Sequence, residues 1–129
     1  MTKEMIRIAN CSGFYGDKLS VAKDMVEGGP IDVLTGDYLA ELTMTILYNQ
    51  KIKRGEDHGY VGTFLKQFKD VAKSTQEKNI KIVSNAGGLN PKAMALEVEK
   101  IIDELNLKLK VAYIAVSYTH LTLPTNGTV

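Results

Sequence analysis

Short apolar runs alternate with helical stretches along most of the chain. The run at 6–9 is followed by apolar residues at helical spacing over 21–26, and the run at 31–34 is followed by such a stripe over 39–47. A short, mainly apolar run suits a buried strand, whereas apolar residues three and four positions apart suit one face of a helix. The first half of the sequence therefore predicts two strand-loop-helix units.

The second half continues this pattern with one irregularity. An amphipathic helix is expected around residues 64–72, with lysines on its outer face, and no strand directly precedes it. The run IKIVS at 80–84 leads into a helix that begins at Pro91, with Asn90 as its cap. The stretch LKVAYIA at 109–115 is a fourth apolar run. Four such runs predict four strands.

The order of these elements indicates the fold class. Continuous apolar strands that alternate with amphipathic helices are typical of right-handed crossover units in a mostly parallel sheet. A chain of 129 residues is long enough for one domain with a hydrophobic core. We therefore expect an α/β protein with a layered, Rossmann-like, mostly parallel sheet and helices on both of its faces.

The last stretch of the chain, VSYTHLTLPTNGTV at 116–129, contains no Asp, Glu, Lys or Arg, although the rest of the chain is rich in them. A transposon-derived sequencing adapter, read in one frame, encodes VSYTHLTLPT, which agrees with residues 116–125 at every position. We expect residues 115–129 to be adapter-encoded and residues 1–114 to be a truncated natural domain. His120 would then have no catalytic role. The alternative is a genuine polar edge strand and turn.

The charge balance excludes some classes of partner. Sixteen basic and 15 acidic residues give a net charge of +1, so nothing attracts the chain to nucleic acid or to an anionic membrane. No apolar run reaches the roughly 18 residues of a membrane-spanning helix, and the first residues lack a signal-peptide pattern. The single cysteine, Cys11, fits a reducing compartment. We expect a cytoplasmic protein without a metal site that binds small molecules or proteins.

Three loops follow the expected strands and hold the candidate site. They read NCSGFYGD at 10–17, TGDYLAEL at 35–42 and NAGGLNP at 85–91. In an open parallel sheet, ligands bind outside the carboxyl ends of the strands, where such loops gather. Gly13 and Gly16 would let the backbone approach a phosphate or carboxylate at the start of the next helix. The amides of residues 86–89 would form a similar nest. Tight turns are the simpler interpretation of these glycines, and the dinucleotide and ATP fingerprints are absent.

Three carboxylates are the candidate catalytic residues. Asp17 and Asp37 each follow a strand, where a carboxylate could bind a ligand hydroxyl, coordinate a cation or act as a general base. Each could instead cap the following helix. Glu41 is one helical turn beyond Asp37, so both carboxylates could face one site as a pair. Glu41 could equally be an ordinary solvated side chain.

Four other side chains have both a functional and a structural interpretation. Cys11 lies beside the first loop, where a helix N-terminus could activate a thiol, although a single cysteine is more often a small buried hydrophobe. His58 belongs to the polar linker EDHG and is expected to face solvent. Tyr15 and Tyr38 could offer hydroxyls to a ligand or could cover the edge of the sheet.

The same loops, taken with their flanking strands, resemble one known family. The segments IRIANCSGFYGD, GGPIDVLTGDYLAELTMTIL and IKIVSNAGGLNP, in this order and at these intervals, are similar to the N-terminal domain of the acyclic terpene utilisation protein A (AtuA) family. The resemblance covers residues 6–114. It implies a role in the breakdown of citronellol- and geraniol-type acyclic terpenes, alongside acyl-CoA enzymes that include a geranyl-CoA carboxylase.

The resemblance also suggests a ligand and a set of binding positions. A branched acyl or acyl-CoA intermediate would be bound or transformed, or the chain would be a non-catalytic binding or assembly subunit for an acyl-CoA carboxylase, or a sensor of a small ligand. A full-length protein could form homo-oligomers, and no cofactor is identified. Besides the carboxylates, the matching ligand-binding positions are Asn10, Ser12, Gly13, Tyr15, Gly16, Thr35, Gly36, Asn85, Gly87, Gly88 and Asn90.

Overall fold

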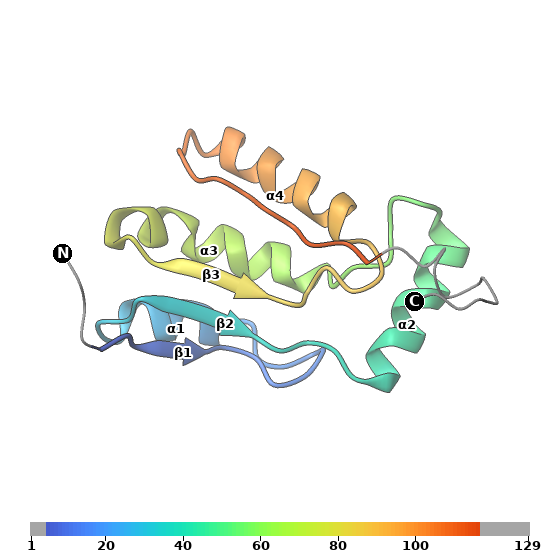
Figure 1. Ribbon diagram of the computed structural model, residues 1–129, viewed down its shortest axis with the longest axis horizontal. Coiled ribbons are helices and arrows are strands. Elements are labelled where there is room, and N and C mark those ends of the chain that lie inside the picture. Colours follow the sequence, from blue (N-terminus) through green and yellow to red (C-terminus); the bar gives the residue numbers. More distant parts are fainter. Residues whose placement is uncertain (1–4, 117–129) are drawn as a thin grey trace.

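The computed structural model describes residues 5–116 as a parallel sheet flanked by helices (Figure 1). Its elements in chain order are β1 (Ile8–Asn10), α1 (Val21–Glu27), β2 (Val33–Gly36), α2 (Glu41–Arg54), α3 (Thr63–Lys78), β3 (Lys81–Ser84) and α4 (Pro91–Glu104). The expected strands and helices therefore occur in the expected order as far as α4. The α/β fold class is confirmed.

The three described strands form one sheet in the order β1-β2-β3, and both neighbouring pairs are parallel. The register places Ala9 beside Leu34 and Leu34 beside Ile82, and these side chains pack into the core. Successive strand residues face opposite sides of a sheet. Ile8 and Val83 accordingly lie on the other face, where they are 65% and 61% exposed.

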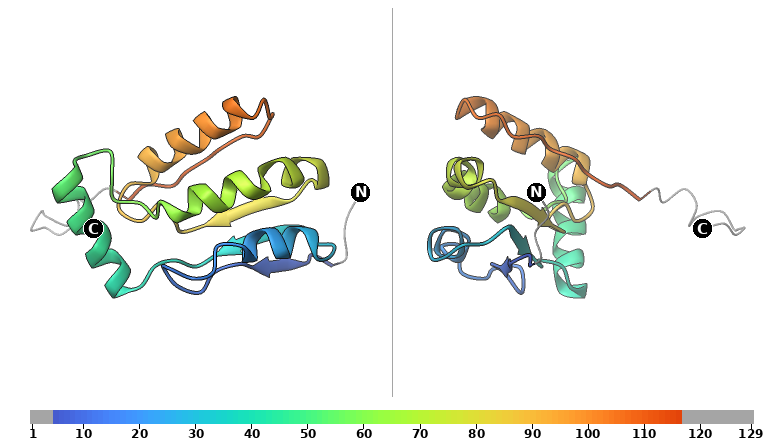
Figure 2. Two further views of the ribbon diagram at one scale, coloured as in Figure 1. Left: turned by 180° about the vertical axis from the view of Figure 1, so that it is seen from behind. Right: turned by 60° about the vertical axis from the view of Figure 1, so that its left-hand side comes forward.

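Helices α1, α3 and α4 lie on one side of this sheet (Figure 2). α1 and α3 contact each other on that face, and α4 packs against α3 (Figures 1 and 2). Cover on both faces was expected, but no helix within residues 5–116 lies over the opposite face. Parallel strands in sequential order, joined by right-handed crossovers, place every connecting helix on the same side. Cover on both sides requires a reversal of strand order, which the described sheet does not contain.

The helix α2 crosses the carboxyl ends of the strands instead of lying on a face of the sheet (Figure 1). Thr43 and Leu47 are buried and attach it to the rest of the molecule, whereas Leu42, Tyr48 and Ile52 are exposed. Residues 55–62 then connect α2 directly to α3. This agrees with the sequence, in which no strand was expected directly before α3. As a result, α2 borders the edge of the sheet at which the candidate loops lie.

The expected strand over 109–115 is absent from the described sheet. Residues 107–116 carry no regular secondary structure, although Leu107, Leu109 and Val111 pack against the core. These alternate side chains hold the segment in place, although its backbone does not pair with β3. Among the described residues, β3 is therefore an edge strand.

Two further expectations concern the membrane and the last residues of the chain. Among residues 5–116, no helix has the length and apolar character needed to cross a membrane. Residues 117–129, which include His120 and most of the stretch expected to be adapter-encoded, lie outside the described residues. The adapter origin of that stretch stays a prediction.

Candidate functional site

Backbone and side-chain hydrogen bonds join the three candidate loops at the carboxyl edge of the sheet. The Asp37 N–H donates to the Ser12 carbonyl at 2.9 Å, which joins the first loop to the second. The Tyr38 N–H donates to Asn85 Oδ1 at 2.9 Å, which joins the second loop to the third. Parallel strands end at one edge, and the structure brings the loops together there as the sequence pattern indicated.

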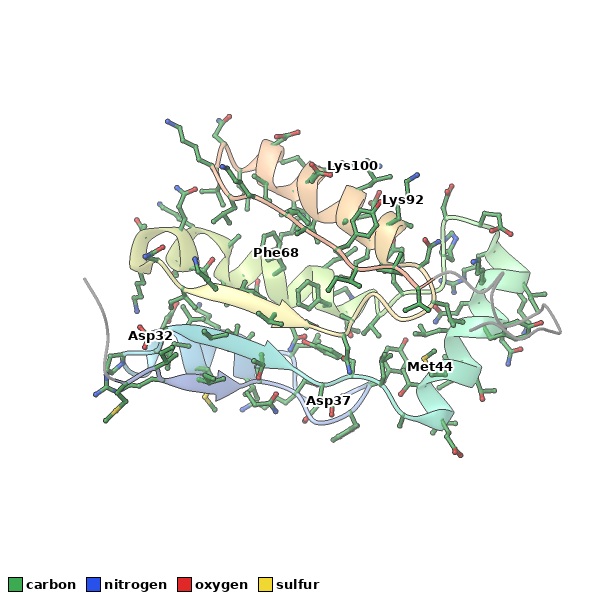
Figure 3. All side chains as sticks on the ribbon, in the orientation of Figure 1. Asp32, Asp37, Met44, Phe68, Lys92 and Lys100 are labelled. Atoms are coloured by element: carbon green, nitrogen blue, oxygen red, sulfur yellow. The ribbon has the colours of Figure 1, made fainter. Side chains whose placement is uncertain are left out.

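The Asp37 carboxylate has one fixed oxygen. Asn85 Nδ2 donates to Asp37 Oδ1 at 2.8 Å, and within residues 5–116 this is the one hydrogen bond that the carboxylate accepts. Asp37 is exposed and lies in the extended stretch between β2 and α2 (Figure 3). It does not cap α2, because that helix has Ala40 at its N-cap position and no side-chain cap. The carboxylate is therefore oriented and open to a ligand.

The Asp17 carboxylate is used within its own loop. The Gly13 N–H donates to Oδ2 at 3.0 Å and the Lys18 N–H donates to Oδ1 at 2.8 Å. These two donors hold the pKa of Asp17 below its ordinary value of 3.8. Asp17 does not cap α1 either, since the N-cap of that helix is Ser20. The Asp17 side chain thus accepts the Gly13 N–H, which was expected to bind an anionic ligand.

Glu41 does not share a helical turn with Asp37. It is the first residue of α2, and Ala40 before it has an extended backbone, with φ −154° and ψ 175°. The four-residue spacing places two side chains on one face only when the intervening residues are helical. The expectation of a helical carboxylate pair is therefore wrong, and Glu41 is simply an exposed residue near the site.

The loop after β3 does not form an open nest of amides. The Ala86 N–H donates to Ser84 Oγ, the Gly88 N–H to the Asn85 carbonyl and the Leu89 N–H to the Gly59 carbonyl. These internal hydrogen bonds fold the loop tightly and leave few of its amides for an anion. The alternative interpretation of its glycines, as turn residues, is the better one, and Gly88 has a positive φ of 55°.

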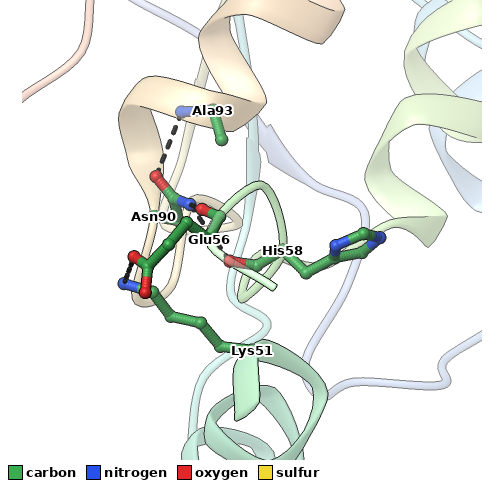
Figure 4. Close-up of polar contacts among 5 residues, drawn as sticks. All are labelled: Lys51, Glu56, His58, Asn90 and Ala93. Carbon is green, nitrogen blue, oxygen red and sulfur yellow. Dashed lines mark hydrogen bonds and ion pairs between the residues drawn. The ribbon is translucent and has the colours of Figure 1, made fainter. Parts of the chain in front are cut away.

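Asn90 has a structural role, which Figure 4 shows. Its Oδ1 accepts the Ala93 N–H at 3.2 Å, so the expected helix cap is confirmed. Its Nδ2 donates to the carbonyls of Glu56 and His58, at 2.6 and 3.0 Å, which ties the linker between α2 and α3 to the start of α4. The expected exposure of His58 is wrong, because its side chain is partly buried and its Nδ1 is buried without a hydrogen-bond partner in the described part of the chain.

Asn10 and Thr35 lie beside the first loop on the open face of the sheet. Thr35 Oγ1 donates to Asn10 Oδ1 at 3.1 Å, and Asn10 Nδ2 donates to the Ser12 carbonyl at 2.9 Å. Ser12 itself is buried, and its hydroxyl donates to the Phe14 carbonyl. Asn10 and Thr35 could thus meet a ligand, whereas the Ser12 side chain supports its loop.

The other matching positions have mainly structural surroundings. Tyr15 packs against the core. Gly16 has a φ of 97°, a left-handed conformation that favours glycine. A Cβ at Gly36 would lie 2.6 Å from the Tyr38 ring, and one at Gly87 would lie 2.7 Å from Pro91 Cβ.

A buried polar group beneath the site was not expected from the sequence. The Tyr38 hydroxyl donates to Gln67 Oε1, and Cys11 Sγ lies 3.9 Å from the same hydroxyl oxygen. All three side chains are buried. Burial raises the pKa of the Cys11 thiol, which opposes the nucleophile interpretation. Gln67 could have been suspected, because it is a polar residue on the apolar stripe of α3.

The buried thiol and phenol make the fold sensitive to high pH. Burial raises the pKa of Cys11 above its ordinary 9.0 and the pKa of Tyr38 above its ordinary 10.0. The unfolded chain releases the thiol proton from about pH 9 and the phenol proton from about pH 10, while the folded chain keeps both. The free energy of unfolding should therefore fall as the pH rises from about 9 toward the raised values, by about 1.4 kcal/mol per pH unit for each proton. Urea denaturation across this range measures the fall.

A pair of tyrosine variants tests the cause. Tyr38→Phe should make the fall above about pH 10 less steep, because it removes the buried phenol. Tyr48→Phe is the matched control, since Tyr48 is 57% exposed. Equal slopes for the two variants would contradict this account.

The fold and the site define an α/β protein whose strand-end loops present an oriented carboxylate at the carboxyl edge of a parallel sheet. No group of three or more His, Cys, Asp or Glu residues in the described part of the chain is arranged to hold a metal ion. A family model described as "Acyclic terpene utilisation family protein AtuA" matches residues 6–123. The chain belongs to this family, and its role is linked to acyclic terpene utilisation.

The match confirms the resemblance found from the three segments and extends beyond Ile114. Comparison with curated proteins gave no match, and neither did comparison with solved structures.

Proposed function

We propose that the chain binds and transforms a branched acyl or acyl-CoA intermediate of acyclic terpene utilisation, with Asp37 as the residue that accepts a proton. The observation that carries this proposal is the carboxylate of Asp37, which is exposed and held at one oxygen by Asn85 at 2.8 Å. Membership of the AtuA family, whose description links it to acyclic terpene utilisation, supports a substrate that derives from an acyclic terpene.

Asp37 is a better candidate for the base than Asp17. Both oxygens of Asp17 accept backbone N–H groups, and its lowered pKa makes it a weaker base. Asp37 accepts a hydrogen bond at Oδ1 only, among the described residues, so Oδ2 can face a substrate. Asn85 also accepts the Tyr38 N–H, which fixes the amide and with it the direction of the carboxylate.

The proposed step is proton abstraction next to a thioester carbonyl. The proton would pass from the α-carbon of the acyl group to Oδ2 of Asp37, and the electron pair of the C–H bond would form the thioester enolate. A positioned general base typically contributes about 10²- to 10⁴-fold to such a step.

Exchange of the α-protons of citronellyl-CoA for deuterium, followed by NMR in heavy water, tests this proposal. We expect the unmodified chain to promote the exchange and Asp37→Asn to slow it by about 10²- to 10⁴-fold. The substituted side chain keeps an oxygen that can accept the hydrogen bond from Asn85 Nδ2, so the fold of the variant should persist. Asp70→Asn is the matched control, because Asp70 is exposed on α3, away from the loops. Exchange at equal rates in both variants would contradict the role of Asp37.

A second candidate is a non-catalytic assembly subunit for an acyl-CoA carboxylase. It is favoured by the open face of the sheet, where Ile8 and Val83 are each more than half exposed. Exposed apolar side chains grouped on one surface are typical of protein interfaces. Binding of citronellyl-CoA without exchange, together with co-elution with a purified acyl-CoA carboxylase, would support this candidate over the enzyme.

A further inference from the structure

A groove of about 880 Å³ separates β3 from the segment Lys108–Ile114. Its wall on one side is residues 79–85 and on the other side residues 108–114. Its floor is made of apolar side chains from α3 and α4, among them Phe64, Phe68 and Val98. The groove therefore opens the core along the edge of the sheet.

We propose that Lys108–Ile114 closes this groove by pairing with β3 as a fourth parallel strand. The walls favour a strand as the occupant, because an edge strand presents unpaired N–H and C=O groups. An apolar ligand chain in the groove would leave these groups without hydrogen bonds, at a cost in free energy. A strand would satisfy them.

The hydrogen bonds of β3 identify the amides that would be paired. The Lys81 N–H donates to the Asp32 carbonyl at 3.0 Å, on the side of β2. Successive peptide groups of a strand point in opposite directions within the sheet, so Val83 shares the direction of Lys81. The N–H groups of Ile82 and Ser84 consequently point toward the groove.

The segment is already positioned for pairing. The Leu107 N–H donates to the Ile102 carbonyl at 3.0 Å, and the Lys108 N–H donates to Gln76 Oε1, which fixes its start beside the end of α3. Leu109 and Val111 pack against the core while Lys110 between them is exposed, as in a strand with one buried face. The connection from β3 through α4 to this segment is a crossover of the kind that joins parallel strands.

Closure would also add to the candidate site. Asn85 and Gly87 line the same groove as Ile114, and Asn85 orients the Asp37 carboxylate. The closed segment would thus bring a fourth strand end to the carboxyl edge. This inference does not depend on the reaction proposed for Asp37.

Amide hydrogen exchange, measured residue by residue by NMR on the 129-residue chain, tests the closure. We expect Ile82 and Ser84 to exchange at least about tenfold more slowly than unprotected amides, as Lys81 and Val83 do. Val111→Lys should remove the protection of Ile82 and Ser84 only, because it places a charge on the buried side of the segment. Ala112→Lys is the matched control, since Ala112 is exposed.

The amides of Lys81 and Val83 are the internal reference that distinguishes local opening of the segment from unfolding of the sheet. If Val111→Lys also removes the protection of Lys81 and Val83, the milder variant Val111→Thr replaces it in the same comparison. Unprotected Ile82 and Ser84 in the unmodified chain, beside protected Lys81 and Val83, would overturn the proposal. Protection of Ile82 and Ser84 that arises only when decanoate is added would overturn it as well, because an acyl chain would then be the occupant.

Discussion

Phe64→Ala is expected to lower the free energy of unfolding by about 3–5 kcal/mol. Phe64 is 8% exposed and lies at the centre of the aromatic packing between α3 and the candidate site. Its ring is 6.0 Å from that of Tyr38, in an edge-to-face arrangement, and 6.3 Å from that of Phe68. Removing it leaves a cavity that these rings can fill only in part.

Phe14→Ala is the matched control for this variant. Phe14 is 57% exposed, so its removal should change the free energy of unfolding by only about 0.5 kcal/mol. Urea denaturation monitored by circular dichroism measures both changes. Similar losses in the two variants would show that α3 does not pack against Tyr38 as described.

Gly88→Ala is expected to destabilise the fold by about 2–4 kcal/mol. Gly88 has a φ of 55°, and a Cβ there would lie 2.5 Å from Leu47 Cδ1 and 2.9 Å from the Gly59 carbonyl oxygen. The cost combines a left-handed backbone with an overpacked contact between the third loop and α2.

Gly29→Ala is the comparison for Gly88→Ala. A Cβ at Gly29 meets no atom within 4 Å, and its φ is not positive, so this change should be neutral or slightly stabilising. Melting temperatures of the two variants give the test. A Gly88→Ala variant as stable as Gly29→Ala would mean that the loop after β3 does not lie against α2.

Local periodicity was sufficient to predict most of the fold. The apolar runs and helical stripes indicated the order of strands and helices, because each element is encoded by its own residues. The dipeptide Asn90-Pro91 indicated the start of α4, because a capping side chain before a first-turn proline is a local signal. The prediction that helices cover both faces of the sheet was wrong for the described residues. The side on which a helix lies depends on the spatial order of the strands and not on any one segment.

The candidate site was predicted in its location but not in the roles of its residues. The strand-end loops meet because parallel strands end at one edge. Asp17 and Asp37 looked equivalent in the sequence, and only the loop conformation shows that Asp17 accepts the N–H groups of Gly13 and Lys18. The contact of Asn85 with Asp37 spans 48 residues, and no local pattern indicates such a pair.

Chemical-shift mapping with citronellyl-CoA tests the central claim most directly. Spectra of the ¹⁵N-labelled chain would be recorded during the titration, with free CoA as the reference. The account predicts that the largest shifts occur at Gly13, Asp37 and Asn85, where the three loops meet. Shifts confined to Ile8 and Val83 on the open face of the sheet, or no shifts at all, would contradict it.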